Sequence, residues 1–93
     1  MSQPRIEIYV TTICPYCVRA KTLLQKKGLQ YVEINAEDPA VRAAMVERAG
    51  GMRTVPQIFI GKTHVGGCDD LYALEKADKL DPLVAAEAAQ AAG

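Results

Sequence analysis

The sequence has no excess of charge, no long apolar run and few cysteines, and each absence excludes a class of protein. Eleven Lys and Arg residues balance eleven Asp and Glu residues, so no summed field draws the chain toward nucleic acid or an anionic membrane. No window reaches the ~18 consecutive apolar residues of a membrane span, and residues 1–4 do not begin a signal peptide. Three cysteines, an odd number, do not fit a secreted disulfide framework. We therefore expect a cytoplasmic protein that binds neither nucleic acid nor membrane.

The chain is short enough that all of its elements must share one hydrophobic core. Its 93 residues, 49% of them hydrophobic, suffice for one core and leave no room for a second. We therefore expect a single domain over residues 1–93, and a monomer. The alanine-rich tail, residues 85–93, has few apolar side chains to bury, and we expect it to fray despite its helix propensity.

The first third of the chain alternates between strand and helix patterns. Apolar residues at every second position predict a strand over residues 5–10, and a shorter strand is predicted over residues 30–34. Between them, residues 16–27 have a helical pattern that ends at Gly28. Two strands joined by one helix pair in parallel through a right-handed crossover. The helix is expected to bury Cys17, Ala20, Leu23 and Leu24.

The remaining chain predicts a helix, a hairpin and two further helices. Asp38 and Pro39 start a helix that ends at residues 50–51. A hairpin follows, with strands over residues 55–60 and 63–65. The next helix is predicted over residues 71–77, after Asp69 and Asp70, and the last one starts at Asp81 and Pro82. The helix that starts at Asp38 and Pro39 is expected to bury Val41, Ala44, Met45 and Ala49.

These elements follow the order β-α-β-α-β-β-α-α along the chain. A parallel βαβ pair comes first and a hairpin second, which predicts a mixed four-stranded sheet with helices on both faces. We therefore expect an α/β fold of the thioredoxin-like type.

The motif Cys14-Pro15-Tyr16-Cys17 lies between the first strand and the first helix. In a cytosolic protein, two thiols separated by two residues at such a junction indicate a redox-active dithiol. The N–H groups and the dipole of a helix start favour a thiolate, which is the reactive form of cysteine. Cys17 lies one turn further along the helix and should be more buried. We therefore expect Cys14 to attack disulfides and Cys17 to resolve the mixed disulfide.

Two further segments carry backbone that suits a peptide-like ligand. Thr54-Val55-Pro56 opens the third strand, and a cis bond before Pro56 would turn the preceding backbone outward toward an extended substrate. Residues 66–70, Gly-Gly-Cys-Asp-Asp, place a bare turn and two carboxylates at a helix start. Backbone N–H groups there can bind a carboxylate, and a carboxylate side chain can bind an ammonium group. Helix capping is the alternative role for at least one of the two aspartates.

Together, CPYC, TVP and GGCDD in this order and spacing resemble a dithiol glutaredoxin of the short bacterial type. The resemblance covers residues 6–83. It implies a glutathione-dependent thiol-disulfide oxidoreductase that reduces protein disulfides and glutathionyl mixed disulfides. Such an enzyme would take part in electron transport and cell redox homeostasis. Glutathione would be the co-substrate, and no metal is expected. The protein partners would be disulfide-containing or glutathionylated proteins, with ribonucleotide reductase as a candidate.

The resemblance also implies roles for individual residues. Cys14 would be the nucleophile and Cys17 the resolving thiol. Glutathione would lie across the ends of the three motifs. Its contacts would be Tyr16 at the sulfur, Thr54, Val55 and the cis proline Pro56 along its cysteine, Gly67, Cys68, Asp69 and Asp70 at the γ-glutamyl end, and Arg53 or Gln57 at the glycine carboxylate.

The sequence departs from the family pattern at Thr11. Many glutaredoxins have a lysine three residues before the first cysteine, and this chain has threonine. A point charge for the glycine end of glutathione is therefore missing. Either Arg53 or another basic group replaces it, or glutathione binds more weakly; the reaction class does not change.

Two other functions stay open at this stage. Cys14, Cys17, His64 and Cys68 add up to a Cys₃His zinc set, although a helix and a hairpin strand are not expected to converge on one ion. A related variant is an iron–sulfur cluster that bridges two subunits through Cys14 and glutathione, which Pro15 disfavours by family analogy. The other function is a glutathione-independent hydrogen donor served by a flavoprotein reductase. GGCDD disfavours it, because a γ-glutamyl clamp has no purpose without glutathione.

Overall fold

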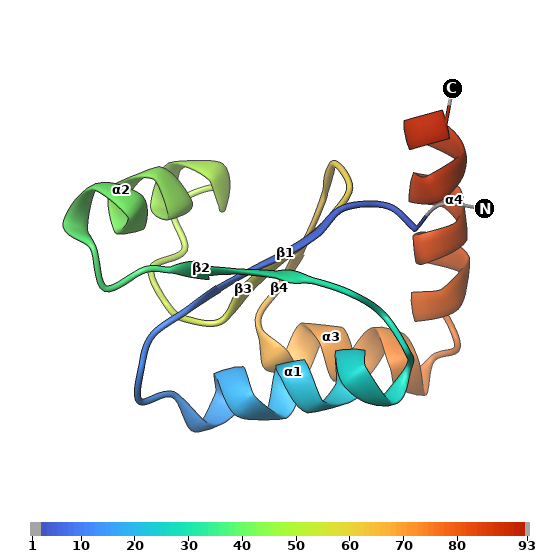
Figure 1. The fold of residues 1–93 in the computed structure, drawn as a ribbon, viewed down its shortest axis with the longest axis horizontal. Helices are drawn as coiled ribbons and strands as arrows, with labels where there is room; N and C mark the ends of the chain where they lie inside the picture. The colour runs from blue at the N-terminus through green and yellow to red at the C-terminus, as the bar shows by residue number, and fades with distance from the viewer. Residues whose placement is uncertain (1–2, 93) are drawn as a thin grey trace.

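The structure is a computed structural model that describes residues 3–92. Met1, Ser2 and Gly93, which the predicted domain and tail include, lie outside the described residues. Strands and helices follow the predicted order (Figure 1). The strands are β1 (Ile6–Val10), β2 (Val32–Asn35), β3 (Gln57–Ile60) and β4 (Thr63–Gly66), and the helices are α1 (Pro15–Lys26), α2 (Pro39–Arg48), α3 (Cys68–Lys76) and α4 (Leu80–Ala92).

The strands within residues 3–92 form one mixed sheet in the order β2-β1-β3-β4. β1 and β2 are parallel, with Ile8 opposite Glu33, and α1 makes the crossover between them. β3 is antiparallel to β1 and to β4, and Gly61 and Lys62 make the turn between β3 and β4. The predicted α/β fold of the thioredoxin-like type is therefore confirmed.

The sheet separates two layers of packed side chains. On one face, Ile6, Ile8 and Val10 pack with apolar residues of α1, α3 and the start of α4. On the other face, Tyr9 and Phe59 pack against α2. Figure 1 shows α1 and α3 below the sheet and α2 above it. Because successive residues of a strand point to opposite faces, β1 contributes to both layers, and helices cover both faces as predicted.

Helix α1 follows its prediction closely. It starts at Pro15, one residue before the predicted start, and ends at Lys26. Gly28 has a φ of +71°, the left-handed conformation that glycine adopts most easily after a helix. The helix buries all four predicted residues, Cys17, Ala20, Leu23 and Leu24.

Two strands, β2 and β3, begin two residues later than predicted. β2 runs over Val32–Asn35 rather than over residues 30–34. β3 starts at Gln57 rather than at Val55. The reason for the second difference is that Pro56 has no N–H group to donate to a neighbouring strand. Residues 55 and 56 therefore lie in a loop before the sheet, where their backbone is free to meet other groups.

In helix α2 the predicted cap is confirmed and the predicted buried face is partly wrong. Asp38 is the capping residue, and its side chain accepts hydrogen bonds from backbone N–H groups of the first turn. Met45 and Ala49 are buried and Val41 is half-buried, but Ala44 is exposed. The helix meets the sheet along a narrower stripe than its apolar residues cover, so Ala44 lies outside the contact.

Helix α3 begins at Cys68, three residues before the predicted start at residue 71. The chain turns directly into the helix because Gly66, with a φ of +114°, adopts a conformation that other residues rarely reach. Asp70 caps the helix from inside its first turn, since its Oδ2 accepts the N–H of Gly67 at 2.9 Å. The predicted capping aspartate therefore lies in the helix and not before it.

Helix α4 lies at one end of the sheet and reaches Ala92 (Figure 1). Glu87 is 7% exposed, and its carboxylate accepts the backbone N–H of Lys62 at 2.8 Å and the hydroxyl of Thr63 at 2.9 Å. These bonds connect the helix to the β3–β4 turn. Fraying of residues 85–93 stays a prediction. Each helix within residues 3–92 is too short or too polar to cross a lipid bilayer.

Candidate active site

The Cys14-Pro15-Tyr16-Cys17 motif forms the turn from β1 into α1. Cys14 precedes the helix in an extended conformation, and Pro15 takes the first helical position, where no N–H donor is needed. The backbone N–H of Cys17 donates to the Sγ of Cys14 at 3.1 Å. In the reduced protein, this donor and the helix start would stabilise a thiolate at Cys14. The motif has the strand-to-helix position that the sequence predicts.

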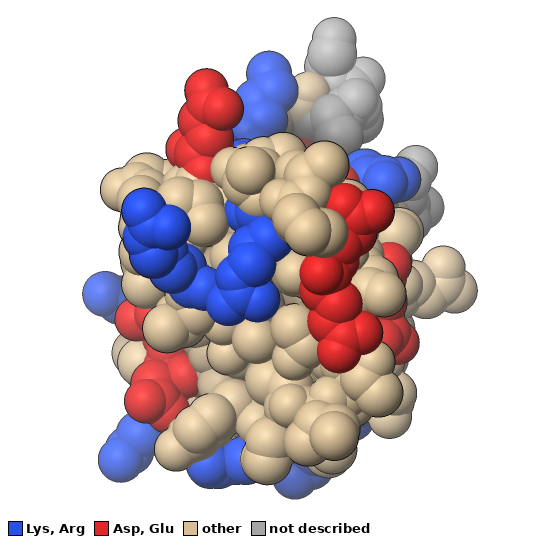
Figure 2. All heavy atoms as spheres, turned by 90° about the vertical axis from the view of Figure 1, so that its left-hand side faces the viewer, with Lys and Arg blue, Asp and Glu red and all other residues tan. Residues whose placement is uncertain are grey.

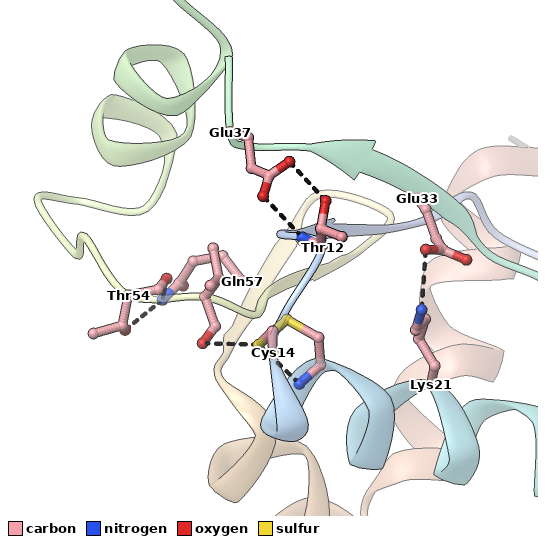
Figure 3. Close-up of a disulfide and its surroundings, with 9 residues drawn as sticks. Thr12, Cys14, Lys21, Glu33, Glu37, Thr54 and Gln57 are labelled. Carbon is pink, nitrogen blue, oxygen red and sulfur yellow. Dashed lines mark hydrogen bonds and ion pairs between the residues drawn. A yellow bond between two sulfur atoms is a disulfide. The ribbon is translucent and has the colours of Figure 1, made fainter. Parts of the chain in front are cut away.

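Cys14 and Cys17 form a disulfide, with 5.1 Å between their Cα atoms (Figure 3). Cys17 is 1% exposed, whereas Cys14 is half-buried. A molecule in solution can therefore reach the sulfur of Cys14 more easily than that of Cys17. Such a difference in access suits one attacking and one resolving thiol.

The loop before β3 lies beside this disulfide. The peptide bond between Val55 and Pro56 is cis, as the resemblance implies. The carbonyl oxygen of Val55 lies 3.9 Å from the Sγ of Cys14, a contact that Figure 3 marks. Because residue 55 is outside the sheet, its backbone can pair with an extended peptide bound next to the sulfur.

Residues 66–70 meet the same loop from the side of α3. A Cβ atom on Gly67 would lie 3.5 Å from the carbonyl oxygen of Pro56, so the two backbones run close together. Cys68 is buried at the start of α3, and Asp69 is exposed in its first turn. The segment therefore adds a helix N-terminus and an exposed carboxylate to the region around Val55.

A groove of about 370 Å³ lies between these segments. One lining residue, Met52, is absent from the sequence prediction; it is 42% exposed in a loop without any periodic pattern. A large apolar residue two positions before the TVP motif is the signal that could have identified it. The other lining residues all have predicted glutathione contacts: Tyr16, Thr54, Val55, Pro56, Gly67, Cys68, Asp69 and Asp70.

Two residues with predicted glutathione contacts do not line the groove. Arg53 lines a separate hollow on α2, and its carbonyl oxygen accepts a hydrogen bond from Arg42 Nη2 at 2.8 Å. Gln57 is fully buried, and its Nε2 donates to the carbonyl oxygen of Thr54 at 3.0 Å. The side-chain amide of Gln57 is thus bound to protein groups and does not face a ligand in the groove.

The segment before Cys14 contacts an acidic side chain. Thr12 donates its backbone N–H at 3.2 Å and its hydroxyl at 2.7 Å to the carboxylate of Glu37 (Figure 3). These bonds, the hydroxyl first, lower the pKa of Glu37 below its ordinary value. Glu37 is therefore ionised at neutral pH. The neighbouring Thr11, where many glutaredoxins have lysine, thus adjoins a negative charge rather than supplying a positive one.

Cys68 is a thiol in the wall of the groove. Burial raises the pKa of the Cys68 thiol, with a smaller opposing effect of Arg19 and a further rise from Asp69. At neutral pH Cys68 is thus protonated and a poor nucleophile. The guanidinium of Arg19 lies 5.8 Å from the ring centre of Tyr16, which puts a positive charge near that end of the groove.

The four residues of the Cys₃His set are not brought together. Within residues 3–92, no three His, Cys, Asp or Glu side chains are close enough to share a metal ion. His64 stacks on Phe59, which belongs to the layer that packs against α2. Cys17 and Cys68 belong to the layer on the opposite face of the sheet. The sheet itself therefore separates His64 from the cysteines.

Comparisons with known proteins point to one family. The family model for glutaredoxin matches residues 6–65. The glutaredoxin of Pseudomonas aeruginosa is 57% identical over 84 residues, which are 89% of this chain and 99% of that protein. Glutaredoxin 3 of Escherichia coli is 48% identical over 79 residues, 85% of this chain and 95% of that protein.

Solved structures agree with this match. The solution structure of glutaredoxin from Brucella melitensis has 55% identity and a TM-score of 0.79, and covers 90% of this chain and 91% of its own. The crystal structure of a buckwheat glutaredoxin–glutathione complex has 33% identity and a TM-score of 0.82, and the match covers 92% of this chain and 80% of the buckwheat chain. Members of this family are thiol-disulfide oxidoreductases that use glutathione as co-substrate. The chain therefore belongs to the glutaredoxin family and is a glutathione-dependent thiol-disulfide oxidoreductase.

Proposed function

We propose that Cys14 is the nucleophile and Cys17 the resolving thiol. Support comes from the half-buried position of Cys14, the burial of Cys17 and the N–H that Cys17 directs at the Sγ of Cys14. With a glutathionylated protein, the Cys14 thiolate attacks the glutathione sulfur, and the protein thiolate leaves and takes up a proton. Cys14 then carries glutathione as a mixed disulfide. A second glutathione thiolate attacks the bound glutathione sulfur, which releases glutathione disulfide and restores the Cys14 thiolate.

With a protein disulfide, both cysteines take part. The Cys14 thiolate attacks one substrate sulfur, and the other substrate sulfur leaves as a thiolate and takes up a proton. Cys17 then loses its proton and attacks the Sγ of Cys14, which releases the second substrate thiol and closes the disulfide between Cys14 and Cys17. Two glutathione molecules reduce this disulfide in turn and leave as glutathione disulfide. The two electrons that the substrate gains thus come from two glutathione molecules.

Glutathione would lie in the groove with its sulfur next to Cys14. Its cysteine would pair with the backbone of Val55, whose carbonyl oxygen is 3.9 Å from that sulfur. Asp69 would bind the γ-glutamyl ammonium group, because it is exposed in the lining of the groove. Asp70 is less suited to that role, since its Oδ2 already accepts the N–H of Gly67. Tyr16 would lie beside the bound sulfur, and Gly67 and Cys68 would contribute backbone groups.

Arg53 and Arg42 are the candidates for the glycine carboxylate. They line one hollow on α2, and a hydrogen bond from Arg42 to the Arg53 carbonyl connects them. Figure 2, which views the side of the molecule where α2 lies, shows Lys and Arg side chains gathered next to acidic ones. The glycine end of glutathione, extending from Val55 toward α2, would meet this positive charge in place of the missing lysine at position 11.

We further propose that the protein acts as a cytoplasmic monomer in electron transport and redox homeostasis. Its substrates would be disulfide-containing or glutathionylated proteins, with ribonucleotide reductase as one candidate. Support comes from the odd number of cysteines, which fits a reducing compartment. A Cys17→Ser variant, which lacks the second cysteine that resolves a mixed disulfide with a protein, should retain such substrate proteins covalently in the absence of glutathione, and mass spectrometry of the retained proteins would identify them.

The observation that Cys14 is less buried than Cys17 carries this proposal, and an assay of cysteine variants tests it. We would measure glutathione-coupled reduction of a small glutathionyl mixed disulfide and of a protein disulfide. Cys14→Ser should lose both activities, whereas Cys17→Ser should lose only the second. Cys68→Ser is the matched control and should keep both. Full activity of Cys14→Ser would disprove the mechanism, and turnover with thioredoxin reductase in the absence of glutathione would favour the glutathione-independent donor.

A further inference from the structure

A buried chain of hydrogen bonds connects strand β4 to the loop that lines the groove. Gln57 is fully buried at the start of β3. Its Nε2 donates to the carbonyl oxygen of Thr54 at 3.0 Å and to the hydroxyl of Thr54 at 3.3 Å (Figure 3). Its Oε1 lies 2.7 Å from Nε2 of His64 on β4. The chain therefore runs from His64 through Gln57 to Thr54.

The chemistry of the end groups fixes the direction of these bonds. A carbonyl oxygen only accepts hydrogen bonds, so the NH₂ group of Gln57 must face Thr54. The amide oxygen of Gln57 must then face His64, and Nε2 of His64 must carry the proton. The imidazole ring is itself held in place, because it stacks on Phe59 with 4.7 Å between ring centres. His64 is thus a fixed donor.

The loop that receives these bonds has few other anchors. Within residues 3–92, no backbone–backbone hydrogen bond outside the helices and strands involves residues 53–56. Pro56 has no N–H to donate, and Val55 lies before the strand begins. Side chains supply the contacts instead: Arg42 binds the Arg53 carbonyl, and Gln57 binds the Thr54 carbonyl. Gln57 is the buried one of these two donors.

We propose that Gln57 and His64 are positioning residues for the substrate-binding loop. By holding the Thr54 carbonyl, Gln57 sets the direction of the next peptide unit, in which Val55 presents its N–H and C=O to the cysteine of glutathione. His64 acts through Gln57 by fixing which end of the amide faces the loop. This inference rests on the proposed function of Val55, and it gives Gln57 a role in orienting the binding site rather than in touching glutathione.

Kinetics of variants at both positions test the proposal. Gln57→Met keeps the length of the side chain but removes the amide, and it should raise the KM for a glutathionylated substrate about five- to tenfold, the effect of one lost hydrogen bond. Its kcat should stay within about twofold, because Cys14 is unchanged. His64→Phe should raise the KM less, about two- to threefold, since Gln57 can still reach Thr54. Adding His64→Phe to Gln57→Met should give no further rise, because His64 acts only through Gln57.

Two measurements separate positioning from simple loss of stability. The chain has one histidine, so the ¹⁵N resonances of His64 are assigned without ambiguity. They should show the Nε2–H tautomer in the wild type and a mixture of tautomers in Gln57→Met. His64→Gln keeps a hydrogen-bond donor at position 64, so its KM should equal that of the wild type and not show the rise expected for His64→Phe. Each variant's unfolding in urea would be recorded in parallel, with kinetics taken on the folded protein.

An unchanged KM in folded Gln57→Met would overturn the proposal. So would a series of variants at Gln57 and His64 in which the rise in KM simply follows the loss of unfolding free energy. A wild-type His64 with its proton on Nδ1 would also contradict it. Cys14→Ser, assayed alongside, should have no turnover. If Cys14→Ser indeed lacks turnover, the function proposed for Cys14 stands whatever the result at Gln57, so the two failures can be told apart.

Discussion

The backbone N–H of Cys17 donates to the Sγ of Cys14 at 3.1 Å, while the side chain of Cys17 is 1% exposed. In the reduced protein, the residue proposed to resolve the mixed disulfide would therefore supply a hydrogen bond that stabilises negative charge on the sulfur proposed to attack. Cys68, the third cysteine, lies in the wall of the groove that Tyr16 of the CPYC motif also lines, and within residues 3–92 no hydrogen-bond donor is directed at its sulfur. One small site thus contains thiols in two different electrostatic environments.

This difference predicts selective alkylation. In reduced protein at pH 7, iodoacetamide should modify Cys14 much faster than Cys68, because burial raises the pKa of the Cys68 thiol and leaves it protonated. Mass spectrometry of the tryptic peptides over time would measure both rates, with Cys17→Ser as the variant that prevents disulfide formation. Equal rates for the two cysteines would contradict the assignment of Cys14 as the nucleophile.

The Thr12–Glu37 contact predicts a stability difference that depends on pH. Thr12→Val removes the hydroxyl that, with the backbone N–H, lowers the pKa of Glu37. A carboxylate with a lowered pKa stabilises the folded state above the ordinary glutamate pKa of about 4.3, and this stabilisation is lost as the pH falls through the lowered value. Wild type should therefore have the higher urea midpoint at pH 7, and the two proteins should converge at low pH. Thr22→Val on the exposed side of α1 is a control without an acidic partner.

Gly66 predicts a loss of both stability and binding when it is replaced. Its φ is +114°, and a Cβ atom there would collide with the carboxylate of Asp70, which caps α3. Gly66→Ala should therefore destabilise the fold by about 2 kcal/mol or more and raise the KM for a glutathionylated substrate. Gly28→Ala is the matched control. The φ of Gly28 is also positive, at +71°, but a Cβ atom there would have no neighbour within 4 Å, and Gly28 does not line the groove. It should cost about 1 kcal/mol of stability and leave the KM unchanged, so a KM effect common to both variants would refute this reasoning.

Glu87 tests whether the tail is anchored. Its buried carboxylate accepts bonds from Lys62 and Thr63, and Figure 1 places α4 away from the N-terminus of α1, where the dithiol lies. Glu87→Ala should lower the free energy of unfolding by about 2–4 kcal/mol without changing glutathione-dependent activity. Gln90→Ala, at an exposed position of the same helix, should have little effect. An unaltered melting temperature in Glu87→Ala would mean that residues 85–93 fray, as their composition predicts.

The order of the elements could be predicted because periodicity and glycine positions mark them locally. The sequence pattern identifies β1 and the helix that buries Leu24, and both elements are found within a residue or two of their predicted bounds. The direction of the Gln57 side chain could not be predicted, because all four residues of β3 are buried and no polar alternation distinguishes its faces. Met52 lies in an irregular loop, where only the fold determines that it reaches the groove.

Asp69 predicts how the γ-glutamyl end of glutathione is recognised. Its carboxylate is exposed in the lining of the groove, whereas that of Asp70 is occupied by the N–H of Gly67. Asp69→Asn should raise the KM for a glutathionylated substrate about tenfold, the usual effect of losing one charge-assisted hydrogen bond, and the ratio to wild type should shrink at high salt. Asp70→Asn keeps an oxygen that can accept from Gly67, so its KM should change by no more than about twofold. If Asp70→Asn has the larger effect, the ammonium group binds at Asp70 and the capping bond must open when glutathione enters.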